Sequence, residues 1–454
     1  MQDKTSERST LAMANRAVRA ATLGSALEWF DFTLYGAIAA TVLPKLFFPA
    51  LDSTVAVLAS LATFSVGMAA RPLGAVICGH FGDKMGRRNL MLGTVAAMGI
   101  TSVLMGLLPT YAQIGIYAPL LLVLLRVIQG FALGGETSGG QLMALEHAPA
   151  DRRGRYSGLI GMCAPLSQIV ANGVLLALSA TMEPAAFESY GWRIPFIASI
   201  GLVVVGIYIR LRVSETPAFV EMKRLGIASR GRPLQDAVRL HYKTILRMML
   251  FFCGPTALFF LAVVFTLSYL NNTLGVSKQT SFLLLMIGNV CAVAGSIIGG
   301  GLSDRFGRKP VLLFALSATF ILLLCFYPML ATKNFVVMAL AMGLFMGFTQ
   351  VQTGVQAATF VEVFPTNVRY SASALALTGA GLLAGGSVPV LAAWLLKLCN
   401  GSPWGVVAMC GSVNLIALAM IAVGPETAGI DINRTDSLDG GQEEDAQVSG
   451  RAPV

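Results

Sequence analysis

Two acidic side chains lie three residues apart in a long apolar run near the start of the chain. The stretch ALEWFDFTLYG, residues 26–36, contains Glu28 and Asp31, and Tyr35 falls on the same face of a helix. A charge at the centre of a bilayer costs roughly 2.5–3.5 kcal/mol on insertion scales, so it normally faces a cavity or a partner inside the bundle. Acids placed in this way can bind a proton on one side of a membrane and release it on the other.

A basic partner for these acids lies in a later apolar run. At a rise of about 1.5 Å per residue, a helix that enters the membrane near residue 20 carries Asp31 about 16 Å deep. Arg126 reaches a similar depth in its own run. We expect Asp31, opposed by Arg126, to be the leading proton site, and Glu28 and Glu136 are the competing candidates. A static ion pair that ties two helices together is the alternative.

An arginine at membrane depth can also hold a carboxylate through two parallel N–H bonds. We therefore expect the substrate to be a small organic anion that binds near the midplane between the two halves of the chain. The candidate contacts come from both halves: Arg71, Arg126, Tyr35, Gln129, Gln350, Gln352 and Gln356. Helix–helix hydrogen bonding explains the glutamines equally well. A zwitterion whose cation is held by the acids is an alternative substrate.

The amino-acid composition indicates that these side chains lie within a lipid bilayer. Of the 454 residues, 55% are apolar and 12% are charged, whereas an ordinary soluble domain carries about a quarter charged residues. The net charge of +9 is spread over short gaps between apolar runs, so we expect no nucleic-acid partner. The 7 cysteines and 3 histidines lack metal-ligand spacing, and we find no nucleophile or nucleotide-binding motif. We therefore expect no metal, no cofactor and no enzymatic activity.

Apolar runs that cross a bilayer need about 20 residues, and the sequence contains twelve of them. Their approximate limits are 21–47, 54–79, 89–109, 117–145, 156–180, 194–211, 244–270, 280–302, 310–330, 335–361, 371–397 and 404–423. The longest gap divides the runs six and six. The predicted fold class is all-α integral membrane, with twelve transmembrane helices in two six-helix bundles.

The distribution of Lys and Arg predicts which end of the bundles faces the cytoplasm. With the N-terminus inside, 25 of the 32 basic residues lie on the cytoplasmic side and 5 on the outer side. Both termini are therefore expected in the cytoplasm. The predicted organisation is a cytoplasmic tail at 1–20, a bundle at 21–212, a cytoplasmic linker at 213–243, a bundle at 244–427 and a disordered cytoplasmic tail at 428–454.

The sequence repeats itself between the halves. GHFGDKMGRRNL at 79–90 matches GGLSDRFGRKPVL at 300–312 at an offset of 221 residues. Two further echoes follow in the same order, a glutamate seven residues before an arginine and a SETP or PET stretch after the last run of each half. Three ordered echoes at similar offsets indicate a duplicated six-helix unit.

The repeated loops combine glycines, an aspartate and basic residues, which suits a gate at the cytoplasmic rim. Glycines permit a tight turn and close helix approach, and the aspartate and arginines can form charge-assisted bonds. Basic residues that only fix topology are the alternative explanation. The candidate gate residues are Gly79, Asp83, Gly86, Arg87, Arg88, Glu146, Arg153, Gly300, Asp304, Gly307, Arg308, Lys309, Glu362 and Arg369.

These motifs resemble those of a known transporter family. The loops at 79–90 and 300–312 resemble the signature loop of the major facilitator superfamily, and LRVIQG at 125–130 resembles the arginine motif of its fourth helix. EWFDFTLYG, RPLG at 71–74, HFGDKMGRR and GFALGGE at 130–136 are similar to the metabolite:proton symporter family. That family includes carriers for shikimate, 2-oxoglutarate, citrate, and proline or betaine.

The resemblance implies an inner-membrane, multi-pass carrier that works by alternating access, with an acid on the first helix and an arginine on the fourth coupled to protons. This chain has GGETSGG where such carriers commonly have GGEWGG, so Thr137 replaces an aromatic residue. The substrate can therefore differ from those of better-known members.

The predicted function is proton-coupled import of a small organic anion by a monomer in the lipid bilayer. Proton-independent uniport or exchange is the rival transport mechanism. A transporter-like sensor, which binds a ligand without moving it, is the rival from another functional class.

Overall fold

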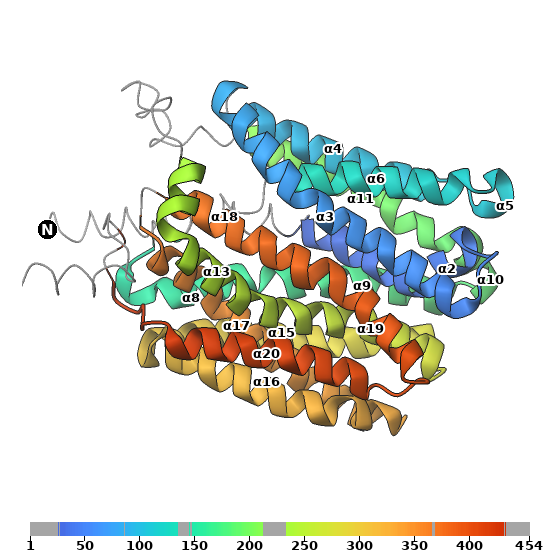
Figure 1. The fold of residues 1–454 in the computed structure, drawn as a ribbon. Helices are drawn as coiled ribbons and strands as arrows, with labels where there is room; N and C mark the ends of the chain where they lie inside the picture. Colours follow the sequence, from blue (N-terminus) through green and yellow to red (C-terminus); the bar gives the residue numbers. More distant parts are fainter. Residues whose placement is uncertain are drawn as a thin grey trace, which may run out of the picture.

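The computed structural model describes residues 26, 28–85, 87–134, 145, 148–211, 233–365, 368–430 and 432. These residues are mostly helical, and no strand occurs among them. Figure 1 shows the helices running side by side along one long axis, with α3, α4 and α6 at one side and α16, α17 and α20 at the other.

The first half of the chain forms a helix over residues 28–41 and then a series of helices that follow the predicted apolar runs. They are α2 (Leu43–Phe47), α3 (Ser53–Met85), α4 (Arg87–Leu107), α5 (Tyr111–Ile114), α6 (Tyr117–Gly134), η1 (Ala150–Arg152), α8 (Arg153–Gly161), α9 (Cys163–Thr181), α10 (Pro184–Ser189), η2 (Gly191–Arg193) and α11 (Ile194–Leu211).

The second half begins within the predicted linker, because α13 starts at Pro233, where a proline suits the first turn of a helix. Its elements are α13 (Pro233–Phe260), η4 (Leu261–Phe265), α14 (Thr266–Ser268), η5 (Tyr269–Thr273), α15 (Lys278–Phe306), α16 (Arg308–Ala331), α17 (Phe335–Val363), α18 (Arg369–Ala380), η6 (Gly381–Gly386), α19 (Ser387–Leu398) and α20 (Trp404–Val423). The segments η4, η5 and η6 are π-helical turns inside longer helices.

Within the described ranges, nine helices are long and apolar enough to cross a membrane. A further apolar helix at Leu92–Leu107 is shorter. The helix at 28–41 and α11 occupy the first and sixth predicted runs. The prediction of an all-helical membrane protein is confirmed.

The repeat in the sequence is visible in how helices pack within each half. Gly74 of α3 and Gly295 of α15, which are 221 positions apart, each lie against the backbone of a partner helix. A Cβ on Gly74 would collide with the carbonyl of Phe131 in α6, and one on Gly295 with the carbonyl of Gly347 in α17. Small residues at these crossings therefore let the α3–α6 and α15–α17 backbones touch.

The two halves contact each other along two lines. Helix α8 of the first half packs against α15 and α17 of the second, and α9 packs against α15. Helix α3 packs against α18, η6 and α19. At the second line Ser65 Oγ donates a hydrogen bond to the carbonyl of Gly386. The helix at 28–41 also meets η4, since a Cβ on Gly36 would lie 3.2 Å from the Val264 side chain.

The α3–α6 crossing gives a stability prediction. Gly130→Ala places a methyl group against the carbonyl of Gly67, so the helices must separate. Overpacking of this kind costs about 1–3 kcal/mol, and we expect a lower thermal midpoint in detergent. Gly93→Ala on the neighbouring helix α4 is the control, because its Cβ would meet nothing within 4 Å. Equal midpoints for the two variants would contradict the close crossing.

Candidate functional site

Asp31 lies in a buried hydrogen-bond network inside the first half. Ser102 Oγ on α4 donates to Asp31 Oδ2. Gln129 Nε2 on α6 lies 3.3 Å from the same oxygen and 2.9 Å from Ser102 Oγ. Arg126 Nη1 donates to Gln129 Oε1. Asp31 and Arg126 are thus joined through Gln129 rather than by a direct ion pair, and all four side chains are buried.

Aromatic side chains and a glycine hold the Arg126 guanidinium. Its central carbon lies 3.8 Å from the ring centroid of Tyr35 and 5.7 Å from that of Phe64, as in cation–π contacts. The Tyr35 hydroxyl is hydrogen-bonded to the Thr63 hydroxyl. A Cβ on Gly67 would lie 2.9 Å from Arg126 Nη2, so a larger residue at this position would require the guanidinium to shift.

Glu28 and Arg71 form a second charged pair. Their atoms Oε1 and Nη2 are 3.3 Å apart, and both side chains are largely buried. The Arg71 guanidinium lies over the Phe32 ring, 4.9 Å from its centroid. The structure therefore brings the predicted acids and arginines together, but pairs Glu28 with Arg71 and links Asp31 to Arg126 through an amide.

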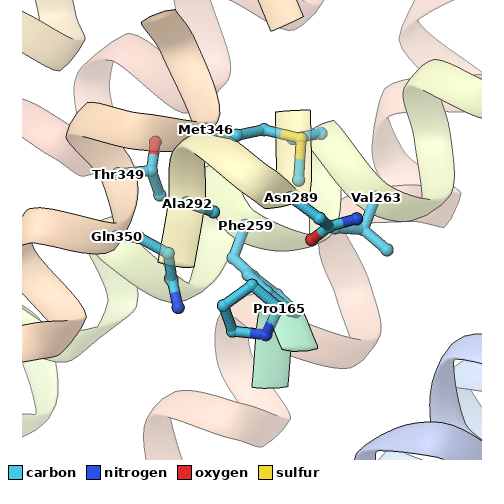
Figure 2. Close-up of a pocket in the computed structure, with 9 residues that line it drawn as sticks. Pro165, Phe259, Val263, Asn289, Ala292, Met346, Thr349 and Gln350 are labelled. Carbon is cyan, nitrogen blue, oxygen red and sulfur yellow. The ribbon is translucent and has the colours of Figure 1, made fainter. Parts of the chain in front are cut away.

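A small cavity lies between the halves (Figure 2), with a volume of about 10 Å³. Pro165 of α9, Phe259 of α13, Asn289 of α15 and Gln350 of α17 are among the residues that line it. This volume is at the lower limit for one water molecule. The cavity must therefore widen before a metabolite can enter.

An aromatic contact separates the charged network from this cavity. Trp29 packs edge-on against Phe259 at a centroid distance of 5.4 Å, and Phe32 packs against Phe260 at the same distance. Phe259 also lines the cavity. One side chain of α13 therefore contacts both the cavity and the helix that carries Glu28 and Asp31.

Sequence reasoning missed two amides on α9. Gln168 and Asn172 are fully buried, and neither side chain has a hydrogen-bond partner within the described part of the chain. They follow Pro165, which lines the cavity, at the i, i+3 and i+7 spacing of one helix face. Two amides within the apolar fifth run could have indicated a site, because a buried polar group needs a hydrogen-bond partner.

The predicted glutamines of α17 fall into different environments. Gln350 lines the cavity, and its Nε2 donates to the Gly161 carbonyl at 3.2 Å. Gln352 donates instead to Thr319 Oγ1 of α16 at 2.8 Å, which is a contact within the second half. Gln356, which lies about one turn beyond Gln352 on α17, is also buried. Asn289, which also lines the cavity, has an Oδ1 without a hydrogen-bond partner in the described ranges.

At one end of the molecule, which we call the gate end, Asp304 joins the two halves. Its carboxylate accepts hydrogen bonds from the backbone N–H groups of Gly154 and Arg155, both at 2.7 Å. Arg308 Nη1 is 2.7 Å from Asp304, and Arg308 Nη2 is 2.9 Å from Glu362. An acid at the first turn of α8 also suits the helix dipole. Gly154 lies against Gly300, which brings α8 and α15 into backbone contact.

The segment after α20 strengthens the gate end. Glu426 accepts hydrogen bonds from the backbone N–H groups of Arg308 and Lys309 at the start of α16, at 2.8 and 3.0 Å. Burial alone would raise the pKa of Glu426, but these and two further backbone bonds hold it below its ordinary value. The contact is therefore present at neutral pH and is lost as the pH falls through this lowered pKa.

Two predicted gate arginines bind this same segment. Arg153 Nη1 of the first half donates to the Ile430 carbonyl at 3.1 Å, and Arg369 of the second half donates to the Ile432 carbonyl. Thr427 Oγ1 donates to Glu362 Oε2 at 3.0 Å. Glu426 and its neighbours belong to the PET echo, which the sequence showed as a repeat without a role.

The opposite end is also closed by a charged contact between halves. Glu188 of α10 lies 3.0 Å from Lys45 and 2.6 Å from Lys278, which begins α15. Burial alone would raise the pKa of Glu188, but the bonds from the two ammonium groups hold it below its ordinary value.

Several predicted residues cannot be placed. Glu136, Gly86 and Glu146 lie outside the described residues. Helices α3 and α4 pass through the first glycine-rich loop, but the surroundings of Gly79 and the side chains of Asp83, Arg87 and Arg88 are outside the description. The contacts of this motif are therefore described for its second copy, at Gly300, Asp304, Gly307, Arg308 and Lys309.

Comparison with protein families adds independent information. The model of the Major Facilitator Superfamily matches residues 21–389 and 248–436. Inner membrane metabolite transport protein YhjE of Escherichia coli is 34% identical over 405 residues, which cover 87% of this chain and 90% of that protein. The proline/betaine transporter of Escherichia coli is 36% identical, with coverage of 84% and 78%. The shikimate transporter of Escherichia coli is 32% identical, with coverage of 91% and 95%.

Solved structures agree on the fold. A crystal structure of a D-xylose-proton symporter superposes with a TM-score of 0.70 at 20% sequence identity, covering 91% of this chain and 98% of that one. A partially occluded inward-open structure of the xylose transporter from Escherichia coli gives a TM-score of 0.71 at 18% identity, with coverage of 91% and 98%.

The Asp304 contact gives a test of the gate end. Asp304→Ala removes the acceptor from the amides of Gly154 and Arg155 and one partner of Arg308. Hydrogen bonds to charged groups contribute about 1.5–3 kcal/mol, so we expect exchange of these two amides to be about tenfold faster or more. Hydrogen–deuterium exchange of the peptide over 150–160 measures this. Asp151→Ala is the control, since that side chain is exposed at the same end. Unchanged exchange in Asp304→Ala would contradict the gate assignment.

Proposed function

The chain belongs to the major facilitator superfamily, and on that premise we propose that it is a proton-coupled importer of small carboxylate-bearing metabolites. Its relatives are transporters of metabolites and not enzymes, and it lies in the inner membrane with its helices in the lipid. The resemblance to the metabolite:proton symporter family, drawn from the sequence motifs, is confirmed.

The buried environment of Asp31 is the observation that carries the proposal of proton coupling. Asp31 Oδ1 has no hydrogen-bond partner within the described part of the chain, whereas Oδ2 is held by Ser102 and Gln129. A proton can therefore occupy Oδ1 without displacing a bond. The Ser102 hydroxyl and the Gln129 amide lead from Asp31 to Arg126, so a change in protonation at Asp31 is felt by the arginine.

Contacts at both ends support alternating access. The gate end is closed through Asp304 and Arg153, and the opposite end through Glu188 and Lys278. Each is a small set of charged bonds that water can replace when the halves separate. We propose that one set breaks at a time, so that the central cavity widens toward one side only. The distribution of Lys and Arg assigns the gate end to the cytoplasm.

The proposed substrate class rests on the relatives and on the cavity lining. Shikimate, proline and betaine, which name the substrates of related transporters, each carry a carboxylate. In this structure Arg71 and Arg126 face Glu28, Gln129 and aromatic rings, so the amides that line the cavity are the polar groups nearest to a ligand bound there. Amide N–H groups can bind a carboxylate, and amide oxygens can bind the ligand's hydroxyl or ammonium group.

A zwitterion is the second candidate substrate, because the cavity is lined by uncharged side chains that include the aromatic ring of Phe259. Such a wall suits a ligand without net charge, and an aromatic face attracts a cationic group. Counterflow from proteoliposomes loaded with shikimate, proline or betaine would separate the classes. Exchange of shikimate alone supports the anion, and exchange of proline or betaine supports the zwitterion.

Proteoliposomes also test the mechanism. An imposed inward proton gradient is expected to drive uphill uptake of the substrate, and an uncoupler is expected to abolish it. Uptake that is insensitive to the uncoupler would favour uniport or exchange. Binding without flux would favour a sensor.

Replacement of the proposed proton site should separate coupling from translocation. Asp31→Asn keeps the shape of the side chain and removes the titrating group, so we expect gradient-driven accumulation to be lost while counterflow exchange remains. Uptake with and without a proton gradient measures both. Glu183→Gln, at an exposed acid between α9 and α10, is the matched control and should accumulate normally. Normal accumulation by Asp31→Asn would remove Asp31 from the mechanism.

Replacing the unpartnered amides of α9 tests whether they bind substrate or only stabilise the fold. Burying a polar group without a partner costs about 1–3 kcal/mol, so Gln168→Met and Asn172→Leu should leave the thermal midpoint unchanged or raise it. Uptake should fall at least about tenfold if these groups bind substrate. Asn414→Leu is the contrasting variant, because Asn414 donates to the Leu316 carbonyl at 2.9 Å and its loss should lower the midpoint. Normal uptake by both α9 variants would exclude these amides from the substrate site.

A further inference from the structure

The wall that the second half contributes to the central cavity carries two free hydrogen-bond acceptors. Asn289 of α15 and Gln350 of α17 line the cavity and are almost completely buried. Asn289 Nδ2 donates to the Leu285 carbonyl at 2.8 Å, and Gln350 Nε2 donates to the Gly161 carbonyl at 3.2 Å. A carbonyl only accepts, so these contacts fix which end of each amide is the oxygen. Within the described part of the chain, neither amide oxygen has a hydrogen-bond partner.

The rest of this wall offers little else to a polar ligand. Thr349 also lines the cavity, but its hydroxyl donates to the Phe345 carbonyl at 2.8 Å, one turn back along α17. The remaining residues of the lining are apolar. Figure 2 shows the Asn289 oxygen turned toward Phe259 and its nitrogen turned toward Val263. A ligand in the widened cavity would therefore meet two acceptors and an apolar surface on this side.

The first half carries hydrogen-bond donors on the facing helix. Gln168 and Asn172 of α9 are fully buried, and in the described ranges neither the oxygen nor the nitrogen of either amide has a partner. Both share a helix face with Pro165, which lines the cavity. A Cβ on Gly173 would lie 3.7 Å from Met286, so α9 meets α15 at this level. The two amide nitrogens can donate to the oxygens of a carboxylate.

This polarity gives a ligand one orientation between the halves. On the basis of the carboxylate transport proposed above, we propose that Asn289 and Gln350 select substrates that carry an N–H or O–H group besides the carboxylate. The carboxylate binds the amides of α9, and the ligand's hydroxyl or protonated amine donates to the two oxygens of the second half. One ligand then bridges both halves. A fully methylated ammonium group cannot satisfy the oxygens, because it has no hydrogen to donate.

The aromatic ring of Phe259 is the rival group for a cationic ligand. A ring face attracts a cation whether or not the cation is methylated, so selection by Phe259 would not depend on hydrogen-bond donors. Buried amide oxygens behave differently, because a ligand without donors leaves them unpaired. Sites built to hydrogen-bond a ligand reject analogues that lack the bonding group. The two explanations therefore predict different ligand preferences.

Two pairs of ligands separate these explanations. Shikimate and cyclohex-1-ene-1-carboxylate share a ring and a carboxylate, but the second has no hydroxyl group. Proline and N,N-dimethylproline share a ring, a positive charge and a carboxylate, but the second has no N–H group. Isothermal titration calorimetry on the purified full-length protein measures the four dissociation constants. We expect a donor-bearing ligand to bind at least about tenfold more tightly than its donor-free counterpart.

Variants assign this preference to a residue. Asn289→Leu removes one oxygen at nearly constant size, so it should weaken binding of the donor-bearing ligand and leave the donor-free ligand unaffected. Gln168→Met should weaken both ligands alike, because both keep the carboxylate. Asn414→Leu is the matched control, since Asn414 of α20 is equally buried and also has an unpartnered Oδ1 in the described ranges, but is not part of the cavity lining. It should keep the full preference.

Equal binding of the two ligands of a pair would overturn the inference and leave the carboxylate function standing. A preference that survives in Asn289→Leu and Gln350→Met would also overturn it, since ligand size would then be the cause. Binding of no ligand from either pair would overturn the proposed substrate class, and the inference with it. If Asn289→Leu fails to fold, Gln350→Met and the ligand pairs on the unmodified protein still decide the matter. Proton coupling affects none of these outcomes, because the uptake experiments test it separately.

Discussion

Charge buried in an apolar bundle is the constraint on which the rest of this structure depends. Each ionised group at membrane depth needs a partner, because an uncompensated charge there is costly. The first half meets this need with two arrangements, Glu28 with Arg71 and Asp31 with Arg126 through Gln129. At the α3–α6 crossing, Gly67 leaves the space that the Arg126 guanidinium occupies.

The free-energy cost of breaking a charged contact is lower at the two ends of the molecule than at its centre. Breaking a fully buried pair leaves a charge without solvent, whereas a pair at a partly exposed rim exchanges its partner for water. Glu188, with both lysine partners partly exposed, belongs to the second class. Asp304 binds backbone N–H groups across the halves, so its bonds are also replaced by water when the halves part. In the proposed mechanism, the buried pairs at the centre therefore stay intact while the contacts at the two ends break and re-form.

The helices, the duplication and the buried charges could be predicted from the sequence, because each leaves a strong pattern in it. Asp31 and Arg126 stood out as charges in apolar runs, and Asp304 stood out through its repeated loop. The bridging place of Gln129 depends on how α4 and α6 cross, which no local pattern encodes. Gln352 and Gln350 are two residues apart on one helix, and only packing shows that Gln350 lines the cavity while Gln352 binds α16.

The second half differs from the first in the geometry of its helices. All three π-helical turns, within the described ranges, lie in the second half, and η4 and η6 both face the first half. A π-helical turn carries an extra residue per turn and is found often at functional sites. Residues of η4 line the cavity, and η6 meets Met68 and Ser65 of α3. Because η4 and Phe259 contact both the helix of Asp31 and the cavity, the proposed mechanism can link protonation of Asp31 to ligand binding through a shift in this part of the chain.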